Sequence, residues 1–115
     1  MNKAEAAMLI VTMTLIVMDY VTGLIKAVMH KDLSSTKMRE GLYHKSAFVM
    51  VVVLAEVIDH AQTYIDLGFT VPVLASACVY ICLTEITSIV ENLGEINPEI
   101  QGSRILQLFR VKEEQ

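Results

Sequence analysis

The sequence contains no tryptophan, two prolines and two cysteines, and it lacks the short motifs that mark common catalytic sites. GxSxG, HExxH, a phosphate-binding glycine loop and a paired CxxC are all missing. Basic residues interleaved with aromatics, typical of nucleic-acid-binding proteins, are missing as well. We therefore expect no enzyme, no nucleic-acid partner, no cofactor and no metal site. The 115 residues fit one domain over 1–115 and exclude a multidomain enzyme.

Apolar residues make up 54% of the chain and are gathered in three blocks, at residues 6–29, 46–58 and 69–90. Apolar blocks of this kind are typical of transmembrane helices rather than of a soluble amphipathic domain. We predict an all-α membrane protein whose three transmembrane helices cover about 3–29, 43–64 and 71–91. A short amphipathic helix at 98–112 is expected to follow on the membrane surface.

The second apolar block is the shortest of the three. Its run AFVMVVVLA is too short to cross a membrane unless residues 43–45 and 56–64 join the same helix. Residues 30–45 have the composition of a loop, in which Ser34 or its neighbours could cap a short interfacial helix. Cys78 and Cys82 lie one helical turn apart and are interpreted as packing residues rather than as a disulfide or a metal pair.

Lysine and arginine are distributed unequally between the blocks. Residues 26–45, at the end of the first block and after it, hold five of the nine, the C-terminal tail holds three, and the second turn holds none. Because cytoplasmic loops are enriched in these residues, we predict a cytoplasmic C-terminus and an N-terminus outside. The residues assigned to membrane topology and to contacts with anionic headgroups are Lys31, Lys37, Arg39 and Lys45.

Each predicted span also carries polar residues, although an aspartate near the centre of a membrane helix costs about 2.5–3.5 kcal/mol on insertion scales. In the first span Thr12, Asp19 and Lys26 recur every seven residues, which places them on one stripe of the helix. Polar residues of the other two spans likewise share one face. The candidate pore or helix-interface residues are Asp19, Lys26, Glu56, Asp59, Glu85, Ser88 and Asn92.

Two interpretations of these residues remain open from the sequence. Asp19 and Lys26 are two turns apart, too far for a direct ion pair, so each needs water or a neighbouring helix. Asp19 and Glu85 either form hydrogen bonds that fix helix packing or face water in an opening. Glu56 and Asp59 either take part in a pore or simply reach the outer interface.

Four short elements follow one another along the chain: MDYVTG at 18–23, LSS at 33–35, Gly41 with Lys45 after it, and EITSIVENLGEINP at 85–98. Together they resemble the toxin secretion/phage lysis holin family, and the similarity covers nearly the whole chain. In that family an Asp-Tyr-x-Thr-Gly element closes the first helix and a Glu-x-x-Ser-x-x-Glu-Asn element closes the last. The matching residues here are Asp19, Tyr20, Thr22, Gly23, Glu85, Ser88, Glu91 and Asn92.

The resemblance implies a small phage or prophage protein that crosses the bacterial cytoplasmic membrane several times and forms homo-oligomers among the lipids. At a set time it would open lesions that let a cytoplasmic endolysin, or in some relatives a toxin, cross the membrane. An antiholin would be a further partner. The sequence allows two alternatives: an antiholin or membrane scaffold, and a small ion channel or transporter.

Overall fold

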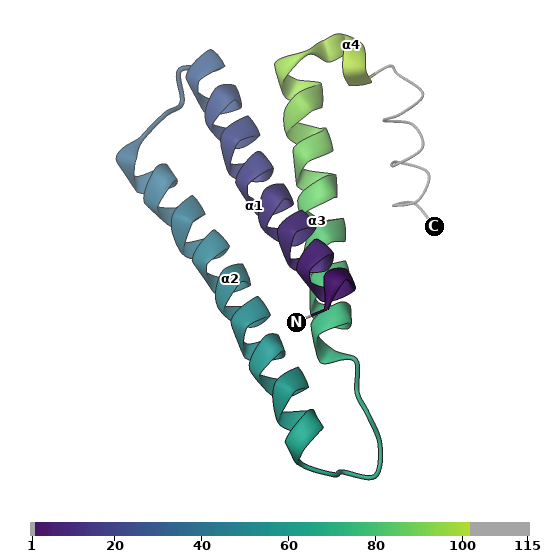
Figure 1. Cartoon of the computed structure of the whole chain (residues 1–115). Coiled ribbons are helices and arrows are strands. Elements are labelled where there is room, and N and C mark those ends of the chain that lie inside the picture. Colours follow the sequence, from purple (N-terminus) through teal and green to yellow (C-terminus); the bar gives the residue numbers. More distant parts are fainter. Residues whose placement is uncertain (1, 102–115) are drawn as a thin grey trace.

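The computed structural model describes residues 2–101, which form four helices and contain no strand. The long helices are α1 (Lys3–Met29), α2 (Ser35–Tyr64) and α3 (Val73–Ile96), and a single turn, α4 (Pro98–Gln101), follows them. Figure 1 shows that consecutive long helices run in opposite directions, with the two connecting loops at opposite ends of the bundle. The prediction of an all-α protein is confirmed.

All three long helices are long and apolar enough to cross a membrane. The shortest of them, α3, has 24 residues. At about 1.5 Å per residue it is about 36 Å long, whereas a bilayer's hydrocarbon core is about 30 Å thick. The second apolar block lies within α2, which has 30 residues. The prediction of three helices able to span a membrane is therefore confirmed.

The loop between α1 and α2 is shorter than the sequence predicts. α1 covers the expected range, and Asn2 caps it by accepting a hydrogen bond from the Glu5 N–H group over 2.8 Å. Ser34 accepts a hydrogen bond from the Lys37 N–H group over 3.1 Å, so α2 begins at the next residue. The predicted loop at 30–45 and the predicted helix start near residue 43 are therefore wrong. The polar segment 35–45 contains no proline and, once capped, continues the helix.

α3 begins two residues later and ends five residues later than the predicted range of 71–91. Its N-cap residue, Pro72, offers no side-chain hydrogen bond, and Asp59 of α2 instead accepts one from the Leu74 N–H group over 3.3 Å. The helix stops before Pro98, because a residue that precedes proline avoids the helical conformation.

The predicted surface helix at 98–112 is described only in its first turn, α4. The remainder of that prediction, with Arg104, Arg110 and Lys112, lies outside the described residues.

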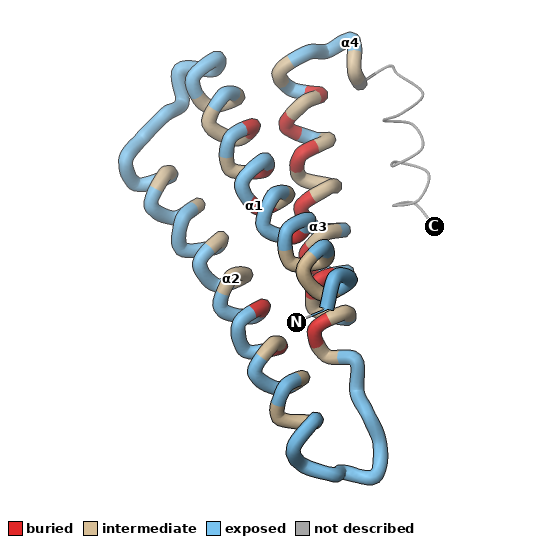
Figure 2. The backbone as a smooth tube through the Cα atoms, viewed as in Figure 1, coloured by how far each residue is buried: buried red, intermediate tan, exposed pale blue. Residues whose placement is uncertain are grey.

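α3 is the helix against which the other two pack. Figure 2 shows buried positions along α3 and fewer on α1 and α2. The apolar core consists of Ile16, Val52, Ala55, Leu74, Cys78 and Ile81. Cys78 is a free thiol within this core.

Polar residues are buried inside the bundle, while large apolar residues are exposed on its outside. The buried polar residues are Thr12, Asp19, Thr22, Glu85 and Asn92. The exposed apolar residues include Ile10, Val17, Met50, Leu54, Val79 and Leu83. Large apolar side chains are most often buried in soluble proteins, so this arrangement fits helices whose outer faces contact lipid.

Candidate functional site

Each long helix contributes one charged residue to the interior of the bundle: Asp19 from α1, Lys45 from α2 and Glu85 from α3. We call these three residues the charged cluster. The Lys45 ammonium donates hydrogen bonds to Asp19 Oδ2 and, over 2.6 Å, to Glu85 Oε2. Glu85 is 1% exposed, Asp19 is 8% exposed and the Lys45 side chain is 16% exposed. Because water screens these ion pairs little, they bind the three helices more strongly than surface pairs would.

Two uncharged side chains complete the hydrogen bonding of the charged cluster. Asn92 Nδ2 donates to Asp19 Oδ1 over 3.1 Å and to Thr22 Oγ1 over 3.0 Å. The Thr22 hydroxyl in turn donates to the carbonyl oxygen of Met18 over 2.9 Å. Both carboxylate oxygens of Asp19 are therefore hydrogen-bonded, one to Lys45 and the other to Asn92, which offsets the cost of placing the acid in an apolar helix.

The charged cluster contains one more acid than base. With both carboxylates ionised, Asp19 and Glu85 carry two negative charges against the single positive charge of Lys45. A buried charge without a full partner costs several kcal/mol, since the surrounding apolar groups cannot replace its hydration. In that state the cluster would join the helices and also hold a negative charge that water would solvate better.

A cavity of about 250 Å³ lies between the charged cluster and the loop that joins α1 to α2. Its polar lining residues are Asp19, Tyr20, Asp32, Lys37, Lys45, Ser88 and Asn92. Near the loop, Lys37 pairs with the exposed Asp32 and lowers the pKa of that carboxyl group. A water molecule occupies about 30 Å³ in the liquid, so this cavity has room for several beside the cluster.

Two glycines lie where helices approach one another near the charged cluster. A Cβ atom on Gly41 would lie 3.5 Å from the Tyr20 ring, and one on Gly23 would lie 3.7 Å from Asn92 Nδ2. Both are ordinary contact distances, so alanine would fit at either position and larger side chains would displace these neighbours. The Asp-Tyr-x-Thr-Gly element thus has its aspartate, threonine and glycine around Asn92 of α3.

The remaining candidate interface residues lie outside the charged cluster. Lys26 pairs with Glu95 of α3 over 3.0 Å, and both side chains are partly exposed. Glu56 and Asp59 lie near the other end of α2, where Glu56 contacts His60 and Asp59 caps α3. Asp19 and Lys26, which are too far apart to pair directly, thus each pair with a residue of another helix.

Ser88 and Tyr20 line the cavity, and four further residues singled out from the sequence are solvent-exposed in the isolated chain. The exposed residues are Lys31, Lys37, Arg39 and Glu91.

Lys45 is the residue of the charged cluster that the sequence interpretation misplaced. It was grouped with the basic loop, whereas the structure places it ten residues inside α2, with its ammonium between two acids. A signal was present, because Lys45 directly precedes an apolar block and the third span contains Glu85 without a base of its own.

The fold and the charged cluster define a class of protein: a small helical protein with several membrane spans that bury charged side chains against one another. Residues 4–108 match the model of the bacteriophage holin family. The chain belongs to this family, which confirms the resemblance noted in its sequence motifs. No curated protein and no solved structure matches the chain.

Proposed function

We propose that the protein is a holin that accumulates in the cytoplasmic membrane of a bacterial host, assembles with copies of itself and opens lesions. A cytoplasmic endolysin would cross the membrane through these lesions and lyse the cell. The family match supports the membrane and lysis context. The observation that carries the proposal is the charged cluster, because it pairs polar groups of all three spans within a single chain.

The closed chain suits accumulation in a membrane. The charged cluster and the Asn92 amide are hydrogen-bonded inside the bundle, and the outer faces present apolar residues such as Val17 and Leu54 to lipid. Because no unpaired charge of the cluster faces the hydrocarbon, many copies can insert without opening a path for ions.

A lesion requires the opposite arrangement, in which polar stripes face water. When neighbouring chains crowd together, α1 or α3 can exchange its contacts within the chain for contacts with another copy. Asp19 and Glu85 would then line water, which solvates the excess negative charge of the charged cluster better than the closed bundle does. In this scheme the ion pairs of the charged cluster hold the bundle closed, and we call the cluster a latch in that sense. Breaking these ion pairs is the step from the closed bundle to the open assembly.

We further propose that the loop between α1 and α2 is cytoplasmic and that the N-terminus lies outside. Lys31, Lys37 and Arg39 lie in or near that loop, whereas the segment 65–72 has neither lysine nor arginine. Fusions of a cytoplasmic fluorescent reporter and of a periplasmic phosphatase to the C-terminus measure this orientation. Phosphatase activity with no fluorescence would reverse it.

Inducible expression in bacteria together with an endolysin that lacks its own export signal tests the function. We expect a delay, then an abrupt loss of membrane potential, release of the endolysin and lysis. Cells that keep growing with the protein in a sealed membrane would instead identify an antiholin or a scaffold. Ion-selective currents without protein release would identify a channel or transporter.

A further inference from the structure

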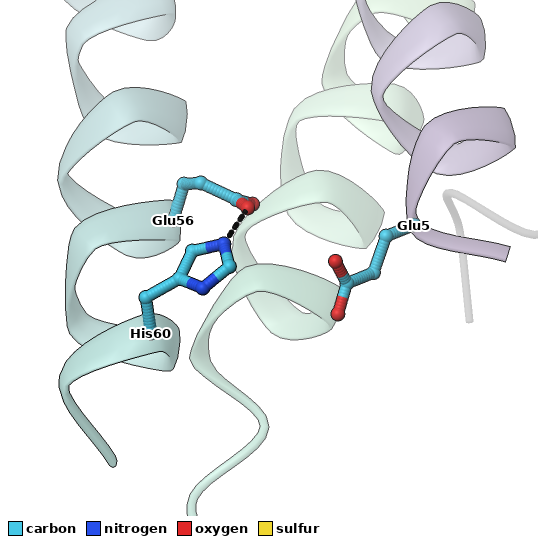
Figure 3. Close-up of side chains that lie close together, drawn as sticks. All are labelled: Glu5, Glu56 and His60. Atoms are coloured by element: carbon cyan, nitrogen blue, oxygen red, sulfur yellow. Dashed lines mark hydrogen bonds and ion pairs between the residues drawn. The ribbon is translucent and has the colours of Figure 1, made fainter. Parts of the chain in front are cut away.

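A second group of ionisable side chains lies at the opposite end of the bundle from the α1–α2 loop. Glu5 belongs to the first turn of α1, and Glu56 and His60 lie one turn apart on α2 (Figure 3). Glu5 precedes Asp19 by fourteen residues, which is about 21 Å along the helix. The group is therefore separate from the charged cluster, and the proposed function assigns it no role.

The contacts within this group leave a gap that a cation would fill. His60 Nε2 and Glu56 Oε1 are 2.7 Å apart, so they share a proton across one helical turn. The other oxygen, Glu56 Oε2, is buried and has no hydrogen-bond partner among the residues that the structure describes. An unpartnered carboxylate oxygen shielded from water is costly. The nearby carboxylate of Glu5 adds a second negative group and no donor.

We propose that Glu5, Glu56 and His60 bind a divalent transition-metal ion, of which Zn²⁺ is the best fit. One ligand atom from each residue lies within 4.8 Å of the other two. Two ligand atoms at about 2.1 Å from a tetrahedral zinc ion lie about 3.4 Å apart. The Glu5 carboxylate therefore has to approach the pair on α2 by up to about 1.4 Å, which rotation of its long side chain allows, while His60 Nε2 and Glu56 Oε1 separate slightly from 2.7 Å.

The ligand set decides which ion the site would prefer. An imidazole nitrogen and carboxylate oxygens are both zinc ligands, and three protein ligands leave the fourth tetrahedral position for water, whereas Ca²⁺ and Mg²⁺ favour sites made of oxygen alone. On binding, the ion takes the place of the proton between His60 Nε2 and Glu56 Oε1, and the ligating neutral imidazole carries its one proton on Nδ1. The ion also supplies the missing partner of the Glu56 carboxylate.

A metal ion in this site would join α1 to α2 at the end of the bundle remote from the α1–α2 loop. α1 packs mainly against α3, and its direct contacts with α2 are fewer. A metal ion bound by Glu5 and by the pair on α2 would add a connection between α1 and α2, which have few direct contacts. It would therefore oppose separation of these two helices.

Zinc titration of the full-length protein, purified without a histidine tag in detergent micelles, tests the site. Competition with a chromophoric chelator measures affinity and stoichiometry, with Zn²⁺ alone as the probe. We expect one ion per chain, and at least about a tenfold loss of affinity in each of E5Q, E56Q and H60Q. His44→Gln is the matched control, since His44 is an exposed histidine near the other end of the same helix, and it should bind as the unmodified protein does.

The thermal unfolding midpoint separates a bridge from binding on α2 alone. Zn²⁺ should raise the midpoint of the unmodified protein and of H44Q, but not that of E5Q, whose backbone cap at Asn2 is unchanged by the substitution. Equal zinc affinity in the unmodified protein and H60Q would overturn the site. Full affinity and a full zinc-dependent rise in E5Q would overturn the bridge. Neither result depends on whether the protein opens lesions.

Discussion

Replacing Lys45 by Met should remove the ion pairs of the charged cluster and make the bundle open earlier. The substitution keeps most of the length of the side chain and removes the ammonium that pairs with both Asp19 and Glu85. The two carboxylates would then face each other in an apolar bundle, with Asn92 as the remaining side-chain donor to Asp19. The closed bundle should lose stability relative to any assembly in which water reaches these acids.

The expected size of the effect follows from burial. Removing one partner of a buried ion pair costs about 3–5 kcal/mol, because the other charge is left without compensation. The Lys45 side chain is 16% exposed and a cavity adjoins it, so the lower end, about 3 kcal/mol, is the better expectation. At about 1.4 kcal/mol per tenfold change, this shifts the equilibrium between closed and open bundles by about a hundredfold.

Two measurements check this prediction. Lysis of induced cells that contain an endolysin should begin earlier with Lys45→Met than with the unmodified protein at equal amounts in the membrane. The purified variant should also unfold at a lower temperature in detergent. Lys37→Met is the matched control, because its pair with Asp32 is exposed and screened, and it should change neither quantity appreciably.

Two further variants distinguish the loss of the ion pairs of the charged cluster from a general loss of stability. Lys45→Arg keeps the positive charge and should retain most of the stability. Adding Asp19→Asn to Lys45→Met removes one of the two unpaired acids and should restore part of the loss. If Lys45→Met left both the lysis time and the unfolding temperature unchanged, the charged cluster would not be a latch.

Three smaller predictions concern the contacts around the charged cluster, each measured by unfolding in detergent. Asn92→Leu removes a donor to Asp19 and should lower the free energy of unfolding by about 1–3 kcal/mol. A normal unfolding curve for this variant would contradict the hydrogen-bond assignment. Gly23→Ala should fit at 3.7 Å from Asn92 Nδ2 and raise stability by up to about 1 kcal/mol through helix propensity, so destabilisation would reveal a tighter contact. Lys26→Ala removes a partly exposed pair with Glu95 and should cost less than about 1 kcal/mol, and a larger loss would mean that this pair is buried in an assembly.

Helix class and the number of spans could be predicted because they depend on local composition. Apolar blocks marked the three helices, and α1 begins where Asn2 caps it through a hydrogen bond that spans only three residues. The start of α2 was missed because segment 30–45 has loop-like composition, and the cap at Ser34 outweighs that composition. Composition says how polar a segment is, but a satisfied cap and the absence of proline decide whether it is helical.

The sequence by itself determined that this chain forms helices able to span a membrane and that Asp19 and Glu85 need either water or a partner on another helix, because the cost of burying an acid depends little on the fold. Only the tertiary structure decided that the partner of both is Lys45, which lies 26 residues from one acid and 40 from the other. Such a pairing depends on how three helices are rotated about their axes and which ends adjoin. Those rotations follow from packing across the whole bundle, so no local pattern in the sequence specifies them.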